Sequence, residues 1–283
     1  MGWKLCIVGT FLFACEAQGQ EPPWQGLFGY DQAHLHALEI RDFGYPWVPV
    51  GFGADTVWMP FDTGDMVGLT VDSAIFDRLG LPCSERWNRR DSAGRLISTG
   101  CTAHGASVEV FGAHYDSLSV FEFSDPSLPG LVGPAQLPGT RFTIDYGRRL
   151  IATDSNTVGN VGPPFEAFPL VRSPGDPLLI LTYAQLEGRD VLVEIDTGKS
   201  RTTIDRSLVE ALRLPVTERG AEVGNVRLGS WSWTVGSARV VDTAGISKGL
   251  PTRIALGIGS DVLRNFVLSV DYRSSQLWLA SRN

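Results

Sequence analysis

An internal repeat constrains this chain more than any other feature of its sequence. The tetrapeptide Phe61-Asp62-Thr63-Gly64 returns 134 residues later as Ile195-Asp196-Thr197-Gly198. One Asp-Thr-Gly is a weak signal, because the triplet is also common in ordinary turns. Two copies inside one longer pattern indicate that two segments of the chain fold alike.

The similarity extends well beyond the tetrapeptide. After each copy come a β-rich run, an aspartate suited to cap a helix, and apolar residues four apart that predict one short helix. Each half later carries a hydrophobic residue followed by glycine, and then an apolar run that ends in Asp-Tyr. A repeat this long is no solenoid and predicts two similar lobes in one chain. The paired segments are 69–82 with 202–215, 133–137 with 259–263, and 141–146 with 266–272.

The lobe boundaries follow from the repeat and from a change in composition. We predict a first lobe at 31–152 and a second at 165–283. The linker between them, 153–164, is rich in Gly, Asn, Ser and Pro and has no periodic apolar pattern.

Bulk composition excludes several classes of protein. The 283 residues are 43% hydrophobic and 19% charged, which is typical of a globular chain and too apolar for disorder. The net charge is −7 and no basic run is present. Nucleic acid and anionic lipid surfaces are therefore excluded as expected partners.

Residues 1–17 predict a signal peptide. Lys4 precedes an apolar run from Leu5 to Ala14, which is too short to span a bilayer. Small residues place the cleavage site after Ala17. The segment ending at Cys15 also resembles a bacterial lipoprotein box, so a lipid anchor remains an alternative. We expect an exported protein of the bacterial periplasm or cell envelope, as a lipoprotein or a secreted form, with no transmembrane segment.

Cysteine and histidine usage adds two expectations. Cys83 and Cys101 would remain in an exported mature chain, and a disulfide between them is favoured over two separate buried thiols. His34 and His36 alternate along a run from 34 to 40 that predicts a strand. No third ligand stands at a recognised spacing, so surface histidines are favoured over a metal site.

The first lobe carries an insertion that the second lacks. The stretch between the short helix and the next apolar run is about 16 residues longer in the first copy, near residues 90–102. It is polar and contains glycine. From the residues alone, a protruding hairpin and an ordinary surface loop are equally good interpretations.

Two aspartates at strand ends suit one kind of chemistry. If the lobes pair about a pseudo-twofold axis, Asp62 and Asp196 meet at the junction, where two close carboxylates share one proton. Such a pair holds a water molecule, removes a proton from it and donates another to a carbonyl oxygen.

The neighbours of each aspartate fit that task. Gly64 and Gly198 let backbone N–H groups approach the carboxylates closely, and the hydroxyls of Thr63 and Thr197 can lock the two turns together. Motifs for a nucleophilic serine, a zinc protease, a phosphate loop or a dinucleotide site are missing from the sequence. Two carboxylates could serve a glycosidase, but such pairs do not normally come as a repeat with Thr-Gly attached.

The doubled Asp-Thr-Gly, with a hydrophobic-Gly segment and an Ile/Val-Asp-Tyr run in each half, resembles the pepsin/retropepsin superfamily of aspartic proteases. The resemblance is to bacterial single-chain members and covers residues 31–283. It implies a mainly β fold of two pseudo-twofold-related lobes with a cleft between them. It also implies an extended peptide or protein substrate, no metal or cofactor, and a monomer, since both half-sites lie in one chain. Asp62 and Asp196 would form the catalytic dyad.

The resemblance extends to the insertion and has one departure. The insertion would match the single flap of bilobal members, with Asp91, Gly94 and Gly100 as candidate flap residues. Family members usually have a small residue after Asp-Thr-Gly, whereas this chain has Asp65 and Lys199. These two could pair with each other across the axis. Alternatively, Lys199 faces the dyad and favours the ionised form of an aspartate.

These observations predict an aspartic endopeptidase that hydrolyses peptide bonds with water activated by Asp62 and Asp196. The first alternative is a weakly active or inactive protein that binds extended peptide in the same fold. The atypical Asp65 and Lys199 favour that alternative, and retention of both aspartates and both threonines favours the enzyme. A carbohydrate-cleaving enzyme is the second alternative.

Overall fold

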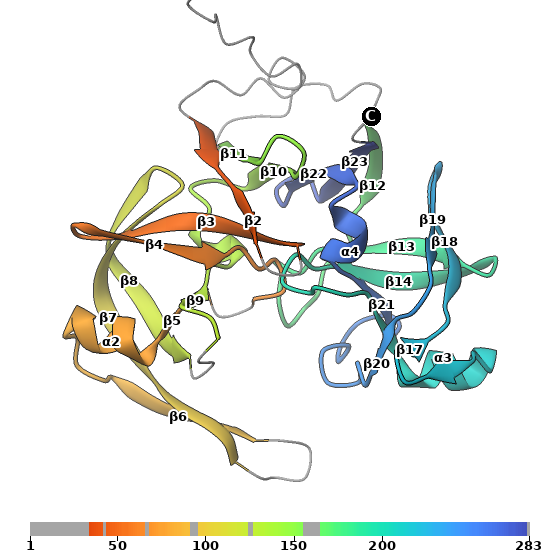
Figure 1. Cartoon of the computed structure of the whole chain (residues 1–283), viewed down its shortest axis with the longest axis horizontal. Helices are drawn as coiled ribbons and strands as arrows, with labels where there is room; N and C mark the ends of the chain where they lie inside the picture. Colours follow the sequence, from red (N-terminus) through yellow and green to blue (C-terminus); the bar gives the residue numbers. More distant parts are fainter. Residues whose placement is uncertain are drawn as a thin grey trace, which may run out of the picture.

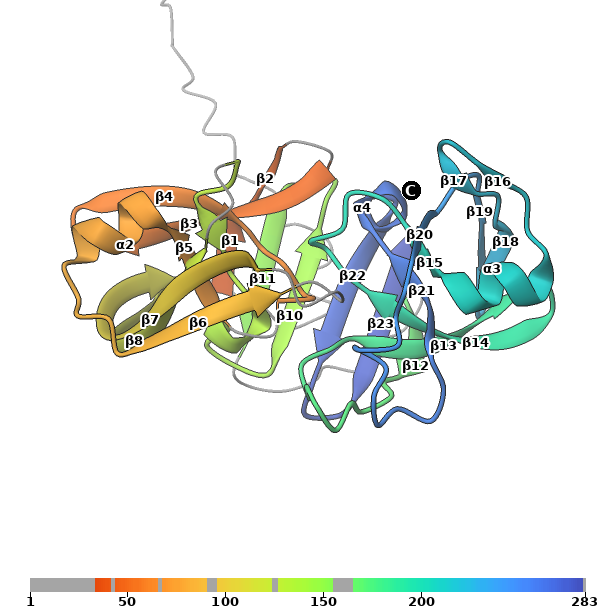
Figure 2. The same ribbon diagram turned by 90° about the horizontal axis from the view of Figure 1, so that it is seen from below.

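The computed structural model of the protein, drawn in Figures 1 and 2, describes residues 34–41, 44–65, 68–90, 96–123, 127–154 and 165–281. The signal peptide predicted at 1–17 with Cys15, most of the predicted linker, and the candidate flap residues Asp91 and Gly94 lie outside these ranges. The described chain is mainly β, as predicted, with three sheets of six or more strands. Within the described ranges, no helix has the length and apolar character needed to cross a membrane.

The eight-stranded sheet is formed by the first half of the chain. Its strands run in the order β2-β3-β7-β8-β5-β9, with β4 paired to β3 and β6 paired to β7. The pairing of β5 with β8 is parallel. The bounds are β2 Glu39–Arg41, β3 Tyr45–Phe52, β4 Asp55–Pro60, β5 Leu69–Asp72, β6 Glu85–Arg90, β7 Leu96–Val110, β8 Ala113–Phe123 and β9 Gly130–Leu131.

The seven-stranded sheet is formed by the second half. Its order is β19-β18-β13-β14-β21-β15-β20, and β14 with β21 and β15 with β20 are its parallel pairs. A separate two-stranded hairpin, β16 and β17, follows the helix of this half. The bounds are β13 Leu181–Leu186, β14 Arg189–Ile195, β15 Thr203–Asp205, β16 Val216–Thr217, β17 Gly220–Ala221, β18 Gly224–Leu228, β19 Trp231–Val235, β20 Arg239–Val241 and β21 Ile254–Ile258.

The third sheet has six strands and draws on both halves. Its order is β1-β11-β10-β22-β23-β12, and β10 pairs with β22 so that Thr143 lies opposite Ser269. The two runs that end each copy of the repeat therefore lie side by side, as Figure 2 shows. The bounds are β1 Leu35–Ala37, β10 Arg141–Asp145, β11 Leu150–Asp154, β12 Glu166–Pro169, β22 Phe266–Asp271 and β23 Gln276–Ser281.

The short helices confirm the local pattern predicted for each copy. Helix α2 (Ser73–Leu79) is capped by the Asp72 carboxylate and ends at Gly80, whose φ of 62° is the left-handed conformation that glycine favours. Helix α3 (Arg206–Leu212) is capped by Asp205 in the same way. The 3-10 helix η3 (Pro134–Gln136) and helix α4 (Ser260–Leu263) follow the hydrophobic-Gly segments.

The insertion in the first half is a hairpin. Strands β6 and β7 pair along their length, from Glu85 opposite Thr102 to Arg90 opposite Leu96. The hairpin extends away from the rest of the first half in Figure 1. Cys83 and Cys101 form a disulfide at its base, as predicted. Gly100 lies opposite Trp87 in this pair, and a Cβ at position 100 would lie 2.3 Å from the indole. Glycine is therefore needed there for packing of the hairpin.

Two strand predictions differ from the structure. Residues 34–40 were expected to form one strand, but β1 and β2 are separate and join different sheets. Leu38 lies between them, 2% exposed, and its N–H donates to Arg149 O at 3.0 Å. The chain therefore passes from one sheet to the other at Leu38. In the second half, the apolar pattern from Leu178 to Tyr183 predicts one strand, whereas β13 begins three residues later, at Leu181.

Candidate active site

The first aspartate of the repeat is fixed by backbone hydrogen bonds on both sides. Strand β4 ends at Pro60, and Phe61 forms a parallel bridge with Val132. The Asp62 N–H donates to Val132 O at 2.9 Å, and the Val132 N–H donates to Pro60 O at 2.9 Å. Phe61 and Val132 are both fully buried. The Asp62 turn is therefore attached to a packed core.

The second aspartate is placed by the same kind of contact. Strand β14 ends at Ile195, which lies beside Ile258 of β21 in a parallel pair. The Asp196 N–H donates to Ile258 O at 3.0 Å. The hydrophobic-Gly segment of each half, Val132-Gly133 and Ile258-Gly259, thus supports the Asp-Thr-Gly turn of the same half.

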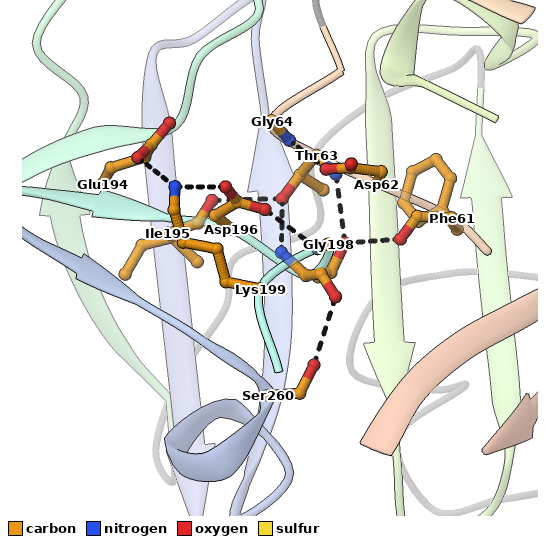
Figure 3. A network of polar contacts seen from close by, with 11 residues as sticks. Phe61, Asp62, Thr63, Gly64, Glu194, Ile195, Asp196, Gly198, Lys199 and Ser260 are labelled. Carbon is orange, nitrogen blue, oxygen red and sulfur yellow. Dashed lines mark hydrogen bonds and ion pairs between the residues drawn. The ribbon is translucent and has the colours of Figure 1, made fainter. Parts of the chain in front are cut away.

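The two turns meet through their threonines (Figure 3). The Thr63 N–H donates to Thr197 Oγ1, and the Thr197 N–H donates to Thr63 Oγ1, each at 3.0 Å. The Thr63 hydroxyl donates to Ile195 O at 3.1 Å, and the Thr197 hydroxyl donates to Phe61 O at 2.6 Å. Both threonines are buried. The contact predicted for these hydroxyls is therefore present.

The glycines bring the two carboxylates together. The Gly64 N–H donates to Asp62 Oδ1 and the Gly198 N–H donates to Asp196 Oδ1, each at 2.8 Å. A Cβ at position 64 would lie 2.5 Å from Asp196 Oδ2, and one at position 198 would lie 2.1 Å from Asp62 Cγ. Each glycine therefore packs directly against the aspartate of the other turn, where any side chain would collide with it.

The two carboxylates interact electrostatically. Burial raises the pKa of Asp62 well above its ordinary value, and the negative charge of Asp196 raises it further. Asp65 adds a smaller contribution of the same sign, while the Gly64 N–H opposes the shift. Asp62 therefore retains a proton at a pH where an exposed aspartate has lost it. A carboxylic acid beside a carboxylate can act as donor and acceptor at once.

Lys199 lies beside the dyad and pairs within its own half. Its Nζ donates to Glu194 Oε2 at 2.5 Å and to Asp196 Oδ2, as Figure 3 shows. Of the two arrangements considered for Lys199, the structure has the one that faces the dyad. Burial disfavours the ammonium, but Asp196 and Glu194 outweigh that effect and raise the pKa of Lys199.

Two further residues complete the surroundings of Asp196. The Ser260 hydroxyl, in α4, donates to Thr197 O at 3.1 Å. Burial raises the pKa of Tyr146, and the charge of Asp196 adds to that shift, so its phenol is neutral. Neither residue was predicted from sequence.

Glu194 was also missed, although a signal was present. It stands two residues before Asp196 at the end of β14, and residues two apart in a strand point to the same face. Its first-half counterpart is Pro60, so comparison of the two copies hides a residue that only one of them has.

The histidines predicted to be surface residues lie outside this site. His36 bonds to Thr153 Oγ1 at 3.1 Å and contacts the ring of Phe111 edge-on. Burial lowers the pKa of His36, and His34 adds to the shift. Across the described ranges, no three His, Cys, Asp or Glu side chains are grouped as a metal site would require.

Comparisons with known proteins add no identification. A scan against protein-family models found no match to the chain, and a search of curated proteins found none either. Function must therefore be argued from the arrangement of Asp62, Asp196 and their neighbours.

Proposed function

We propose that this protein is an aspartic endopeptidase whose two catalytic residues are Asp62 and Asp196. The observation that carries the proposal is the meeting of two Asp-Thr-Gly turns, 134 residues apart, through reciprocal threonine hydrogen bonds. Two carboxylates are thereby held close enough for each to contact the glycine of the other turn. Two acidic side chains held close together, Asp196 buried and Asp62 half-buried, are costly for stability and typical of a catalytic site.

In the proposed reaction the dyad carries one negative charge and one proton. The ionised carboxylate takes a proton from a water molecule, and the oxygen of that water bonds to the scissile carbonyl carbon. The protonated carboxyl gives its proton to the carbonyl oxygen, which yields a neutral geminal diol. The carboxyl that took the proton from water then gives it to the amide nitrogen, and the other carboxylate takes a proton from one diol hydroxyl. The C–N bond breaks, leaving a carboxylic acid and an amine. The dyad returns to its starting charge.

The proposal includes an arrangement and a substrate. We infer two lobes related by a pseudo-twofold axis, because the parallel contacts of Phe61 with Val132 and of Ile195 with Ile258 are equivalent. The substrate would be an extended peptide bound in a cleft between the lobes and covered by the β6–β7 hairpin. One chain supplies both halves of the site, so a monomer suffices.

The disulfide supports a location outside the cytoplasm. Disulfides such as Cys83–Cys101 persist in oxidising compartments and are rare in reducing ones. With the predicted signal peptide, this favours export to a bacterial periplasm or cell envelope. The lipid-anchored and the free mature forms are both compatible with that location.

One observation favours a second candidate function. The Lys199 ammonium occupies Asp196 Oδ2, an oxygen that a dyad would otherwise present to water or to its partner. A protein in which that contact persists could bind extended peptide without cleaving it. Asp62 and Asp196 would then have no kinetic role, which the experiment below detects.

The test is cleavage of a diverse peptide pool from pH 3 to 8, read by mass spectrometry. Wild type is compared with Asp62→Asn, with Asp196→Asn, and with Asp190→Asn at an exposed position as a matched control. We expect defined cuts that both dyad variants lose and the control keeps, with inhibition by a pepstatin-type compound. A folded wild type that binds peptides and makes no cut at any pH would support the second candidate instead.

A further inference from the structure

The strongest asymmetry in the site lies in the residue that follows each Asp-Thr-Gly. In the first copy it is Asp65, and in the second it is Lys199. Asp65 adds negative charge near Asp62, whereas the Lys199 ammonium contacts Asp196 Oδ2. The two carboxylates of the dyad therefore experience opposite local charges, although their backbones are held alike.

Lys199 is built into its position. Its side chain is 26% exposed, while the side chains of its partners Glu194 and Asp196 are 6% and 8% exposed. A Cβ at position 257 would lie 3.0 Å from Lys199 Cε and 3.1 Å from its Cδ. Gly257 of β21 thus leaves room for the methylenes of the lysine, and that glycine pairs with Glu194 across the parallel strands.

Glu194 completes the arrangement from the neighbouring strand position. Its carboxylate shares the ammonium with Asp196 from the buried end of β14. An ammonium between two buried carboxylates is held by charge on both sides, so it cannot turn to solvent without leaving them unpaired. The lysine therefore stays next to Asp196 rather than sampling the surface.

Hydrogen bonding is unequal in the same direction. The Asp196 carboxylate accepts from the Gly198 N–H at Oδ1 and from the Lys199 ammonium at Oδ2. The Asp62 carboxylate accepts from the Gly64 N–H at Oδ1. Donors to a carboxylate favour its ionised form, and a charged donor does so more strongly than a neutral one.

We propose that Lys199, held by Glu194, is a positioning residue that keeps the negative charge of the dyad on Asp196 and the proton on Asp62. This proposal rests on the proposed protease function for its kinetic meaning, but the placement of the proton does not depend on it. Asp196 is then the base that takes a proton from water. Asp62 is the acid that donates to the scissile carbonyl oxygen.

Of the titratable groups described beside Asp196, Lys199, Tyr146 and Asp62 agree with this assignment, and Glu194 acts against it. Lys199 favours its ionised form, and Glu194 opposes it from the far side of the ammonium. The pKa of Glu194 is raised by burial, an effect that Lys199 partly offsets. Tyr146 is neutral, and Asp62 carries the proton because its pKa is raised. The negative charge of Asp65 also favours protonation of Asp62.

The experiment is a titration of the protein labelled with ¹³C at the aspartate carboxyl carbons, followed by NMR. Signals of the dyad are assigned by their loss in Asp62→Asn and Asp196→Asn. Two coupled carboxyls titrate in two steps that belong to the pair. We expect the Asp196 carbon to carry most of the change in the lower step and the Asp62 carbon to carry most of it in the upper step.

The variants that test Lys199 are Lys199→Met, Lys199→Arg and Glu194→Gln, with exposed Lys248→Met as the matched control. Lys199→Met is expected to raise the lower step by about one pH unit or more, because a contacting cation shifts a carboxylate by that order. Lys199→Arg is expected to keep the step low. Glu194→Gln keeps an acceptor for the ammonium, so the step is expected to stay below that of Lys199→Met. The acid limb of kcat/KM is expected to move with each step.

A rise of the lower step in Lys199→Met that Lys199→Arg does not share cannot arise from loose packing alone. A Lys199→Met protein whose lower step and Asp196 signal match wild type would overturn the proposal. If Lys199→Met does not fold, Lys199→Gln replaces it, and a lower step equal to that of wild type in this variant would overturn the proposal. Because the readout is spectroscopic, a wild type that cleaves nothing would refute the protease function and leave the proton placement decided on its own.

Discussion

The hydroxyls of Thr63 and Thr197 each accept a hydrogen bond from the other residue's backbone N–H, and both N···O distances are 3.0 Å. Each hydroxyl also donates to the carbonyl that precedes the opposite aspartate, at Ile195 or Phe61. The four buried bonds tie the two turns to each other in both directions. Neither aspartate can move away from the junction unless these bonds break.

Replacement of Thr197 by valine keeps the shape of the side chain and removes its hydroxyl. The Phe61 carbonyl and the Thr63 N–H would lose their partner in a buried place, and each such group costs about 1–3 kcal/mol. We expect Thr197→Val to lower the free energy of unfolding by roughly 2–4 kcal/mol in urea denaturation. Thr197→Ser, which keeps the hydroxyl, and exposed Thr234→Val are the controls. Equal losses from valine and serine at 197 would contradict the prediction.

Gly198 tests how closely the carboxylates must approach. An added Cβ would lie 2.1 Å from Asp62 Cγ, so the Asp62 carboxyl has to turn out of the dyad. Gly198→Ala is therefore expected to lower kcat/KM about 100-fold or more, by analogy with other small displacements of catalytic groups. The control is Gly236→Ala, since a Cβ at 236 would meet nothing within 4 Å. Full activity of Gly198→Ala would show that the two carboxylates need not be adjacent.

The raised pKa of Asp62 makes the stability of the folded protein depend on pH. Its pKa is raised in the folded protein by burial and by Asp196, so the folded state binds a proton that the unfolded state has released. Stability from this group is fully present below the ordinary aspartate pKa and is lost as pH rises through the raised value. Asp62→Asn cannot ionise, so we expect it to be less pH-sensitive and more stable than wild type at neutral pH. Urea denaturation at pH 4 and pH 7.5, with Asp190→Asn as the control, checks this. A free energy of unfolding that is higher for wild type than for Asp62→Asn at pH 7.5 would contradict the prediction.

The sequence was most informative where local chemistry decides structure. Asp72 and Asp205 cap short helices because their side chains satisfy the first N–H groups, and that can be recognised from spacing alone. The repeat also predicted which aspartates and threonines are brought together, because equivalent turns must pack equivalently. The disulfide followed from the two cysteines left in the predicted mature chain.

What the sequence could not supply depends on contacts between distant segments. The partner of Lys199 could have been Asp65 or the dyad, and the choice depends on Glu194 and Gly257, which hold its ammonium and leave room for its methylenes. The break at Leu38 lies where the chain leaves β11 as its partner and pairs with β3, and alternation along residues 34–40 does not reveal that change of partner. Such choices are made by the assembled core rather than by a local pattern.

The shared sheet joins the two halves through a buried ion pair. Arg141 of β10 donates to Asp271 Oδ2 of β22 at 3.0 Å, and both side chains are less than 5% exposed. Burial alone would raise the pKa of Asp271, but bonds from Arg141 and from the Ser274 N–H outweigh it and lower that pKa. Stabilisation from Asp271 is therefore present above its ordinary pKa and lost as pH falls through the lowered value.

Removal of the arginine should expose this dependence. Arg141→Met leaves the Asp271 carboxylate buried without its guanidinium, which we expect to cost about 3–5 kcal/mol at neutral pH. The deficit should shrink at acid pH, where Asp271 is protonated in both proteins. The matched control is Arg78→Met, since Arg78 pairs with Asp55 at 3.6 Å on the surface, where pairs contribute about 1 kcal/mol or less. Equal losses from the two variants, or a deficit at Arg141 that does not change with pH, would show that this ion pair does not hold the two halves together.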